Sequence, residues 1–497
     1  MSKYCSKSLY DQYEELLTKF EEQEELLKET KELVSNLNNT IESLNETNKK
    51  LVKENEDLKK ELLKIKANNN KDSSNSSKPS SSNGLKKVIT NRREKSNKKQ
   101  GAQKGHKGHS LNSKLDKFIN SGNVQEEIIE INKNENNKNK RYIEKVVIDI
   151  KVTKHVKRYR YYPNEDGKYN IPKYHNQYVQ YGNNVKSMTM DLMINLPNST
   201  DGIVQFVKDI TNNGITLSKG TLINWENLLS SNLEEDTNKI EENLHNSYYI
   251  NHDESQIKID GESYNILCAC NNLYVRLWHS KHKSQDAIDE IGFLPKFKGV
   301  IVKDGTELYN KYGIYLSQCI SHIQRYLKGI YDFNNHKGPK KLSEFFTKYN
   351  NLRNDYIKAK KDKFSENELN NIIKEYDNIL NIWEEELRKD TNNYLFDDEL
   401  KLFKRIKYDN KKMDSSIRGD RDEILYFLKD FKVPSTNNNA ESSQRGVKIK
   451  QKIGKFRSED GASSYCIIKS NILTYKKQKL DIFDSITKVF EGKSIFA

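Results

Sequence analysis

Cysteine and long apolar runs are both scarce in this sequence. Its five cysteines are scattered, odd in number and without a CxxC pair, which argues against a disulfide framework and against a thiolate zinc site. The longest uncharged apolar stretches, such as 266–270, fall far short of the ~18 residues that a membrane-spanning helix needs. The first residues turn acidic and amphipathic where a secretory signal would carry an apolar run. These absences exclude a transmembrane protein and favour the reducing cytoplasm.

Acidic residues are in deficit as well. The chain of 497 residues carries 85 Lys and Arg against 71 Asp and Glu, a formal charge of +14, and only 34% of its residues are hydrophobic. The positive charge favours a polyanionic partner, and the low hydrophobic content indicates that part of the chain is solvated. At a soft prior of ~150 residues per domain, the length allows about three domains.

A heptad pattern fills residues 10–67, which are rich in Glu, Lys and Leu and contain no Gly or Pro. The core positions form two sets, each spaced by seven: Leu37, Leu44, Leu51, Leu58 and Ile65, and Ile41, Asn48, Asn55 and Leu62. This spacing predicts a homodimerising coiled coil, in which the two Asn favour a parallel pair. The alternative is a long solvated helix that packs back on its own chain.

A linker and a basic arm follow, over 68–123. The Asn- and Ser-rich stretch 68–84 contains no apolar residue and predicts a disordered linker. Residues 85–108 then carry nine Lys or Arg and one Glu, a density that suits contact with nucleic-acid phosphates. A merely soluble charged linker is the alternative. The residues predicted to contact DNA here are Lys86, Lys87, Arg92, Arg93, Lys98, Lys99, Lys104 and Lys107.

Two further regions precede the part that carries chemistry. Residues 124–182 alternate and are rich in β-branched and aromatic side chains, which predicts a small β-rich region with a basic face. Its run of Arg and Tyr at 158–162 suits stacking on bases, although an ordinary half-exposed strand has the same appearance. Residues 183–246 predict helices, and we expect them to form a helical DNA-binding region.

Between 247 and 339 the pattern changes to strand, strand, strand, helix, strand, helix, which predicts an α/β layer with a mixed sheet. Asp253 lies inside a strand, and Asp304 directly follows the buried strand 299–303. Carboxylates at such places either form turns or bind a divalent cation. A third acid, Glu441, falls in the first turn of a helix that Asn437 and its neighbours can cap, which favours the cation site.

These residues resemble the insertion-sequence sixty-six (TnpC-type) transposases, a branch of the DDE transposases. The resemblance runs from the heptads and the linker through GAQKGHKGHS, HDES, VKDG and CISHIQRYL to NNNAESSQRGVKIKQKIGKFRSEDGA. It implies an α/β ribonuclease H-like catalytic core, here over 247–339 and 433–497. The intervening 340–432 is helical by pattern and predicts a helical insertion.

The resemblance also implies the chemistry of a DNA transposase, which cuts and joins the ends of an insertion sequence. Asp253, Asp304 and Glu441 become the catalytic carboxylates, which would hold two Mg²⁺ ions that Mn²⁺ can replace. Asp253 would bridge the two metals, with Asp304 on one and Glu441 on the other. Hard cations need oxygen ligands, and phosphoryl transfer needs its charge neutralised, so such a triad suits the reaction.

The sequence departs from the family pattern at three places. No cysteine lies between Cys5 and Cys268, so the zinc-binding segment of many relatives is absent and no structural zinc is expected. Ser442 follows the catalytic Glu where the family usually has Arg, although Arg445 matches a second family arginine. Ser255 stands where Thr is commoner.

Further cationic residues near the three acids are candidates for DNA contact, with a structural role or a solvated helix face as the alternative. They are His322, Arg325, Arg445, Lys448, Lys450, Lys452 and Arg457. The sequence thus predicts a cytoplasmic, nucleoid-associated enzyme whose partners are double-stranded DNA, a second copy of the chain and small accessory proteins of the same element. The competing hypotheses are a catalytically decayed or domesticated DNA-binding protein and a structure-specific nuclease of the same core.

Overall fold

A computed structural model provides the coordinates, which describe residues 9–69, 71–72, 75, 115–120, 124–131, 133, 141, 143–172, 175, 177–389, 396–409 and 419–496. The predicted basic arm, with all eight of its DNA-contact candidates, lies outside them. The chain divides into two compact units, one of residues 1–83, 172–204 and 218–497, and one of residues 84–171 and 205–217. In the described part of the chain, no helix is both long and apolar enough to cross a membrane.

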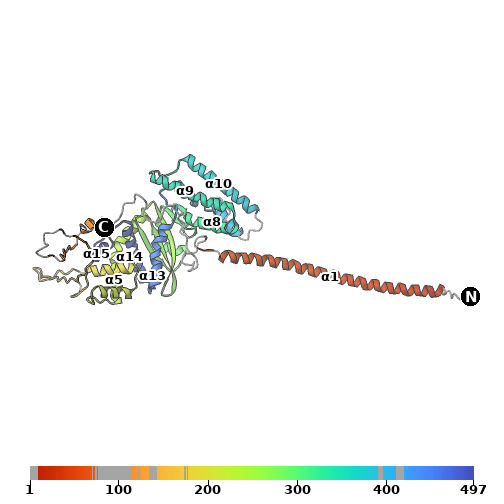
Figure 1. Ribbon diagram of the computed structural model, residues 1–497, viewed down its shortest axis with the longest axis horizontal. Helices are drawn as coiled ribbons and strands as arrows, with labels where there is room; N and C mark the ends of the chain where they lie inside the picture. Colours follow the sequence, from red (N-terminus) through yellow and green to blue (C-terminus); the bar gives the residue numbers. More distant parts are fainter. Residues whose placement is uncertain are drawn as a thin grey trace. The chain divides into compact units, whose positions relative to one another are not determined.

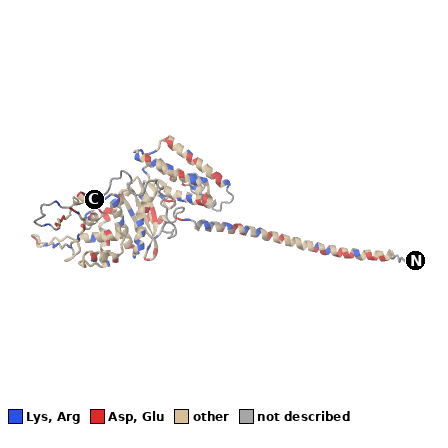
Figure 2. Cartoon of the chain, in the orientation of Figure 1, with Lys and Arg blue, Asp and Glu red and all other residues tan. Residues whose placement is uncertain are grey.

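The heptad region forms one continuous helix, α1 (Leu9–Asn69), of 61 residues (Figure 1). Both signs of charge recur along it (Figure 2). The apolar heptad positions are open to solvent, with Leu44 62% exposed and Leu51 54% exposed. A stripe of this kind on a single chain is what two paired helices would cover.

A five-stranded mixed sheet forms the centre of the larger unit. Its strands are β1 (Tyr249–Ile259), β2 (Glu262–Cys270), β3 (Val275–Ser280), β4 (Val300–Lys303) and β5 (Tyr315–Gln318). They lie in the order β3-β2-β1-β4-β5; β1, β2 and β3 are antiparallel neighbours, whereas β4 and β5 run parallel to β1. The mixed α/β sheet was predicted from the sequence, but its fifth strand was not.

The β1–β2 connection shows how local sequence fixes this register. Asp260 and Gly261 are the only two residues between Ile259 and its partner Glu262, and both have positive φ, 47° and 87°. An Asp-Gly pair favours such a two-residue turn, because its twist matches that of the strands.

Helices cover both faces of the sheet. On one face α13 (Asn438–Ile453) contacts β1 and β2 (Figure 1). α14 (Glu459–Lys477) packs along the outer edge of β3, where its Thr474 and Ser470 hydroxyls accept hydrogen bonds from the Val275 and Leu277 N–H groups. On the other face, side chains of α6 (Glu234–His245) and α7 (Gln285–Ile291) join a buried cluster with Ile250, Leu267 and Ile301. The other described helices outside the insertion and after residue 182 are α3 (Asn183–Met190), η3 (Asp191–Asn195), α4 (Thr200–Ile210), α5 (Lys219–Asn232), η4 (Leu294–Lys296) and α15 (Ile482–Phe490).

The insertion between the strands and α13 is helical in its described residues. After α8 (Ile320–Asn334) it consists of α9 (Lys337–Lys358), α10 (Glu366–Lys389), α11 (Phe396–Lys407) and α12 (Arg421–Lys429). These helices share one apolar core with Trp383 completely buried in it. Residues 410–418, between α11 and α12, lie outside the described part.

The structure differs from the prediction of a small sheet over 124–182. None of the described residues in this range belongs to a strand, and the only helix just before it is α2 (Leu115–Ile119). Apolar side chains of the alternating pattern stand in solvent, with Ile128 88% exposed and Val147 85% exposed. Alternation marks a strand only where a partner strand satisfies the backbone and covers one face, and here neither is present among the described residues.

Candidate active site

Parallel pairing of β1 with β4 brings Asp253 and Asp304 to the same end of the sheet. Asn251 pairs with Val302, and each acid lies two residues further along its chain. Since side chains alternate along a strand, Asp253 lies on the same face as Asn251, the face that α13 covers. Asp304 is the first residue after β4, and its Oδ1 accepts a hydrogen bond of 2.9 Å from the Thr306 N–H. Asp304 therefore both forms a turn and lies at the same end of the sheet as Asp253.

The start of α13 carries Glu441 toward these two acids. Asn437, completely buried, precedes the helix, and its amide ties the helix start to β1. Its Nδ2 donates to the His252 carbonyl at 2.9 Å, and its Oδ1 accepts from Asn251 Nδ2 at 3.0 Å. Three residues beyond Glu441, Gln444 Nε2 donates to the Asp253 carbonyl at 2.8 Å. The first turn of α13 is thus fixed beside the strand that carries Asp253.

The electrostatics of Asp253 reflect this convergence. Burial raises the pKa of its carboxyl to about 8, and repulsion from Glu254, Asp304 and Glu441 adds to the rise. A carboxyl in this environment keeps its proton near neutral pH unless a cation offsets the neighbouring charge. Glu441 Oε1 is buried, and no described residue hydrogen bonds to it. Asp304 and Glu441 thus both repel the Asp253 carboxylate, although among the described residues the oxygens of these three acids do not gather within 4.8 Å of one another. A bound cation would offset this repulsion.

Glu254, the acid next to Asp253, makes contacts away from the other two acids. Glu254 accepts a hydrogen bond from the Tyr309 hydroxyl and forms an ion pair with Lys283. His252, which precedes Asp253 and therefore lies on the opposite face of β1, is buried with its ring against Tyr309, and burial lowers its pKa to about 3. Glu254 and His252 therefore belong to the packing behind the three acids.

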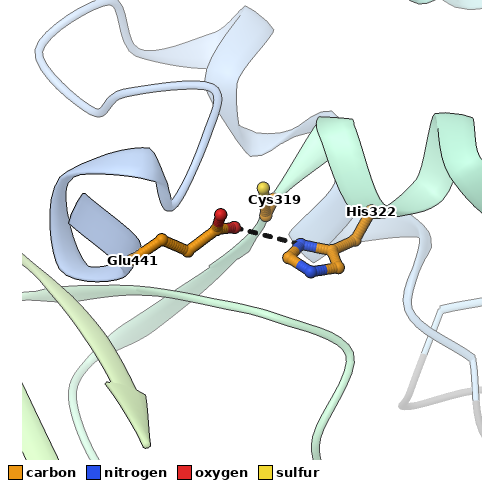
Figure 3. A group of neighbouring side chains, drawn as sticks. All are labelled: Cys319, His322 and Glu441. Carbon is orange, nitrogen blue, oxygen red and sulfur yellow. Dashed lines mark ion pairs between the residues drawn. The ribbon is translucent and has the colours of Figure 1, made fainter. Parts of the chain in front are cut away.

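The start of α8 adds two further side chains. His322 Nδ1 lies 3.9 Å from Glu441 Oε1, and Cys319 is the residue just before the helix (Figure 3). Burial, with the nearby Arg325 guanidinium, lowers the pKa of His322, and the Glu441 and Asp304 carboxylates act in the opposite direction. Burial raises the pKa of the Cys319 thiol.

A family profile described as "Transposase IS66 family" matches residues 202–464, more than half of the chain. The chain belongs to the IS66 transposase family. The matched segment contains Asp253, Asp304 and Glu441, and membership implies a DNA-processing enzyme that binds DNA. No curated protein matches the sequence.

In this IS66-family chain the basic residues after Glu441 do not share one environment. Arg445, Lys448, Lys452 and Arg457 are exposed. Lys448 donates to the Gln256 carbonyl, which attaches it to β1. Lys450 is half-buried near Glu226 of α5, where burial lowers the pKa of Lys450 and raises that of Glu226 to about 7. Lys450 thus faces a helix of its own chain.

Sequence reasoning missed the residues that position the acids. Asn437 was considered only as a helix cap, yet its side chain makes no cap hydrogen bond and reaches β1. Asn251 and Gln444 carried no signal, because their partners lie more than 180 residues away along the chain. The run of three Asn before Glu441 was the visible feature that could have pointed to Asn437.

Proposed function

We propose that this chain is a DDE transposase that cuts the ends of an insertion sequence and joins them to target DNA. The observation that carries the proposal is the convergence of Asp253, Asp304 and Glu441 at one end of the sheet, where burial and then repulsion from the neighbouring acids raise the pKa of Asp253 to about 8. We assign Asp253, Asp304 and Glu441 to two Mg²⁺ ions, which Mn²⁺ can replace. The mixed five-stranded sheet supports a ribonuclease H-like core.

The proposed chemistry is two in-line displacements at phosphorus. First, a water oxygen attacks, the bond from phosphorus to the 3′ oxygen breaks, and that oxygen takes up a proton and leaves as a 3′ hydroxyl. Second, this hydroxyl attacks a target phosphodiester, so one phosphorus–oxygen bond forms as another breaks. When bound, the two cations activate the attacking oxygen and stabilise the leaving one. Asp253 releases its proton as a cation binds.

The DNA-binding part of the proposal rests on charge. Arg445, Lys448, Lys452 and Arg457 are the exposed cations that we assign to phosphates, and the basic arm extends the same role. Arg325, one turn beyond the half-buried His322 and close enough to lower its pKa, is also partly exposed. We assign Lys450 a smaller part in phosphate binding, because Glu226 lies close to it.

Pairing of two chains through α1 completes the proposal, since two DNA ends need two sites brought together. The double variant Leu44→Glu with Leu51→Glu places charge on the apolar stripe, and we expect it to convert a dimer to a monomer in sedimentation equilibrium. Lys53→Glu, on the outer side of the same helix, should leave the dimer intact. A wild-type chain that sediments as a monomer would refute pairing through α1.

Strand cleavage and joining test the catalytic proposal directly. Purified full-length protein is incubated with DNA that carries the element's own ends, with Mg²⁺, Mn²⁺ or a chelator. We expect metal-dependent cleavage and joining, and a loss of at least about a thousandfold in Asp304→Asn, because charge stabilisation by a bound cation contributes several kcal/mol.

Glu307→Gln is the matched control, an exposed acid three residues beyond Asp304, and it should cleave as the wild type does. If the wild type binds DNA but cuts it with neither metal, and accessory proteins of the element do not restore cutting, a decayed DNA-binding protein replaces the proposed enzyme. Cutting that persists in Asp304→Asn would remove the three carboxylates from the mechanism.

A further inference from the structure

Three different donor atoms converge beside the carboxylates. Cys319 and His322 stand at the start of α8, and Glu441 at the start of α13 (Figure 3). Cys319 Sγ, a ring nitrogen of His322 and a carboxylate oxygen of Glu441 all lie within 4.8 Å of one another. The Cys319 N–H donates to the Lys303 carbonyl at 2.8 Å, which fixes the start of α8 beside the strand end that precedes Asp304.

Two of these donors have atoms with nothing to bind. His322 Nδ1 and Glu441 Oε1 are buried, and neither hydrogen bonds to any residue that the structure describes. They face each other at 3.9 Å, beyond hydrogen-bond range. Buried polar atoms are nearly always satisfied, so a pair of unpartnered atoms that face each other marks the place of a third group between them.

The donor set defines the chemistry of that group. Sulfur and imidazole nitrogen suit a borderline cation such as Zn²⁺ or Co²⁺, whereas Mg²⁺ prefers oxygen alone. Three protein ligands are the number found in catalytic zinc sites, where a fourth position stays open. The Asn437 N–H donates to Cys319 Sγ at 3.2 Å, the kind of outer contact that supports a metal-bound sulfur.

We propose that Cys319, His322 and Glu441 form a three-ligand site for a borderline divalent cation of the zinc class, with one position left for water or a phosphate oxygen. The inference rests on the proposed function, since Glu441 is shared. It changes that function in one respect: the two cation positions differ, with oxygen ligands alone around Asp253 and Asp304 and mixed ligands at Glu441. The site is separate from the zinc-binding cysteine pairs of relatives, which this sequence lacks.

Cobalt spectroscopy tests the site without reference to activity. Metal-free full-length protein is titrated with Co²⁺ in a large excess of Mg²⁺, which occupies the all-oxygen position around Asp253 and Asp304. We expect one equivalent to bind with a sulfur-to-cobalt charge-transfer band in the near ultraviolet and the intense visible bands of four-coordinate cobalt. Zn²⁺ should displace the cobalt and bleach both features.

Variants assign each ligand. Cys319→Ser should lose the charge-transfer band, whereas His322→Gln should keep it and bind cobalt at least about tenfold more weakly, the lower end of the loss seen when even a supporting residue is removed. Cys466→Ala, a buried thiol in α14, and His282→Gln, an exposed imidazole, are the matched controls and should retain the wild-type spectrum and affinity. Circular dichroism establishes that each variant is folded.

A wild-type spectrum without a sulfur band overturns the proposal, as does a band that survives in Cys319→Ser. Should Cys319→Ser fail to fold, unchanged cobalt affinity in both His322→Gln and Glu441→Gln refutes the site by itself. The outcome is separable from that of the proposed function. Mg²⁺-dependent cleavage without a cobalt–sulfur band removes only this site, and the band without cleavage under any metal removes only the transposase activity.

Discussion

The two strand-borne acids and the helix-borne acid are held by different means. Asp253 and Asp304 take their places from the backbone pairing of β1 with β4, which ends at Asn251 and Val302, two residues before each acid. Glu441 takes its place from a few side chains, chiefly Asn437, that attach the start of α13 to β1. A site built in this way should tolerate change near the first two acids and be sensitive to single substitutions near the third.

The electrostatic roles differ in the same way. The unfavourable electrostatics fall on Asp253, because burial and three neighbouring acids disfavour its charged form and raise its pKa to about 8. Glu441 instead keeps a buried oxygen without a hydrogen-bond partner among the described residues. The strand end of the site therefore holds a proton that a cation must displace, and the helix end holds an open acceptor.

Asp253→Asn should give the largest change, which we expect in the pH dependence of the free energy of unfolding. The folded pKa of Asp253 lies above the unfolded value of 3.8, so its contribution is fully present below about pH 4 and is lost as pH rises toward 8. Without metal, the wild type should lose stability relative to Asp253→Asn over this window, by on the order of several kcal/mol in total. Urea unfolding in a chelator at about pH 5 and about pH 8 measures the difference.

Magnesium should reverse the sign, because only the wild type gains a full set of carboxylate ligands. Asp260→Asn, an exposed acid in the turn at the end of the same strand, should follow the wild type at both pH values. Parallel pH curves for wild type and Asp253→Asn would show that the carboxyls are not coupled.

Asn437→Ala should come next in size. It removes the Asn437 side chain that donates to the His252 carbonyl, and it removes one of the two acceptors of Asn251 Nδ2, which keeps the Thr436 carbonyl at 3.2 Å; we expect a cost of about 1–3 kcal/mol in unfolding free energy. It also frees the helix start, and a displacement of about 1 Å in Glu441 would lower cleavage by roughly a hundredfold. Asn438→Ala, exposed and one residue further, is the control and should change neither quantity. Wild-type cleavage in Asn437→Ala would mean that Glu441 is positioned by other contacts.

Asp253 and Asp304 show which features of the site the sequence predicts. Asp253 was predicted inside a strand and Asp304 at a strand end, because hydrophobic patterning is local and easily seen. Their pairing depends on parallel strands about 50 residues apart, which patterning alone does not supply. β5 was missed since it has only four residues, two of them not buried, too few for a periodic signal.

The stretch 124–182 marks the opposite limit. Its alternation is as regular as that of β1, yet the described residues form no strand, and Val147 and Ile128 lie open to solvent. β1 has neighbours on both edges, and this region has none in the described part of the chain. Strand propensity depends on packing against neighbouring strands, so an alternating pattern forms a strand only where the fold provides such a neighbour.

Gln444→Leu should have the smallest effect and so gives the sharpest test of the difference between the two ends. Gln444 donates to the Asp253 carbonyl at 2.8 Å, but Asp253 is already held by the strands around it. Loss of one neutral hydrogen bond should cost about 1 kcal/mol, and cleavage should fall only about fivefold or less. Gln451→Leu, seven residues further along α13, serves as the control in the same cleavage assay. If Gln444→Leu impaired cleavage as severely as Asn437→Ala, the strands would not be sufficient to place Asp253, and both ends of the site would depend on α13.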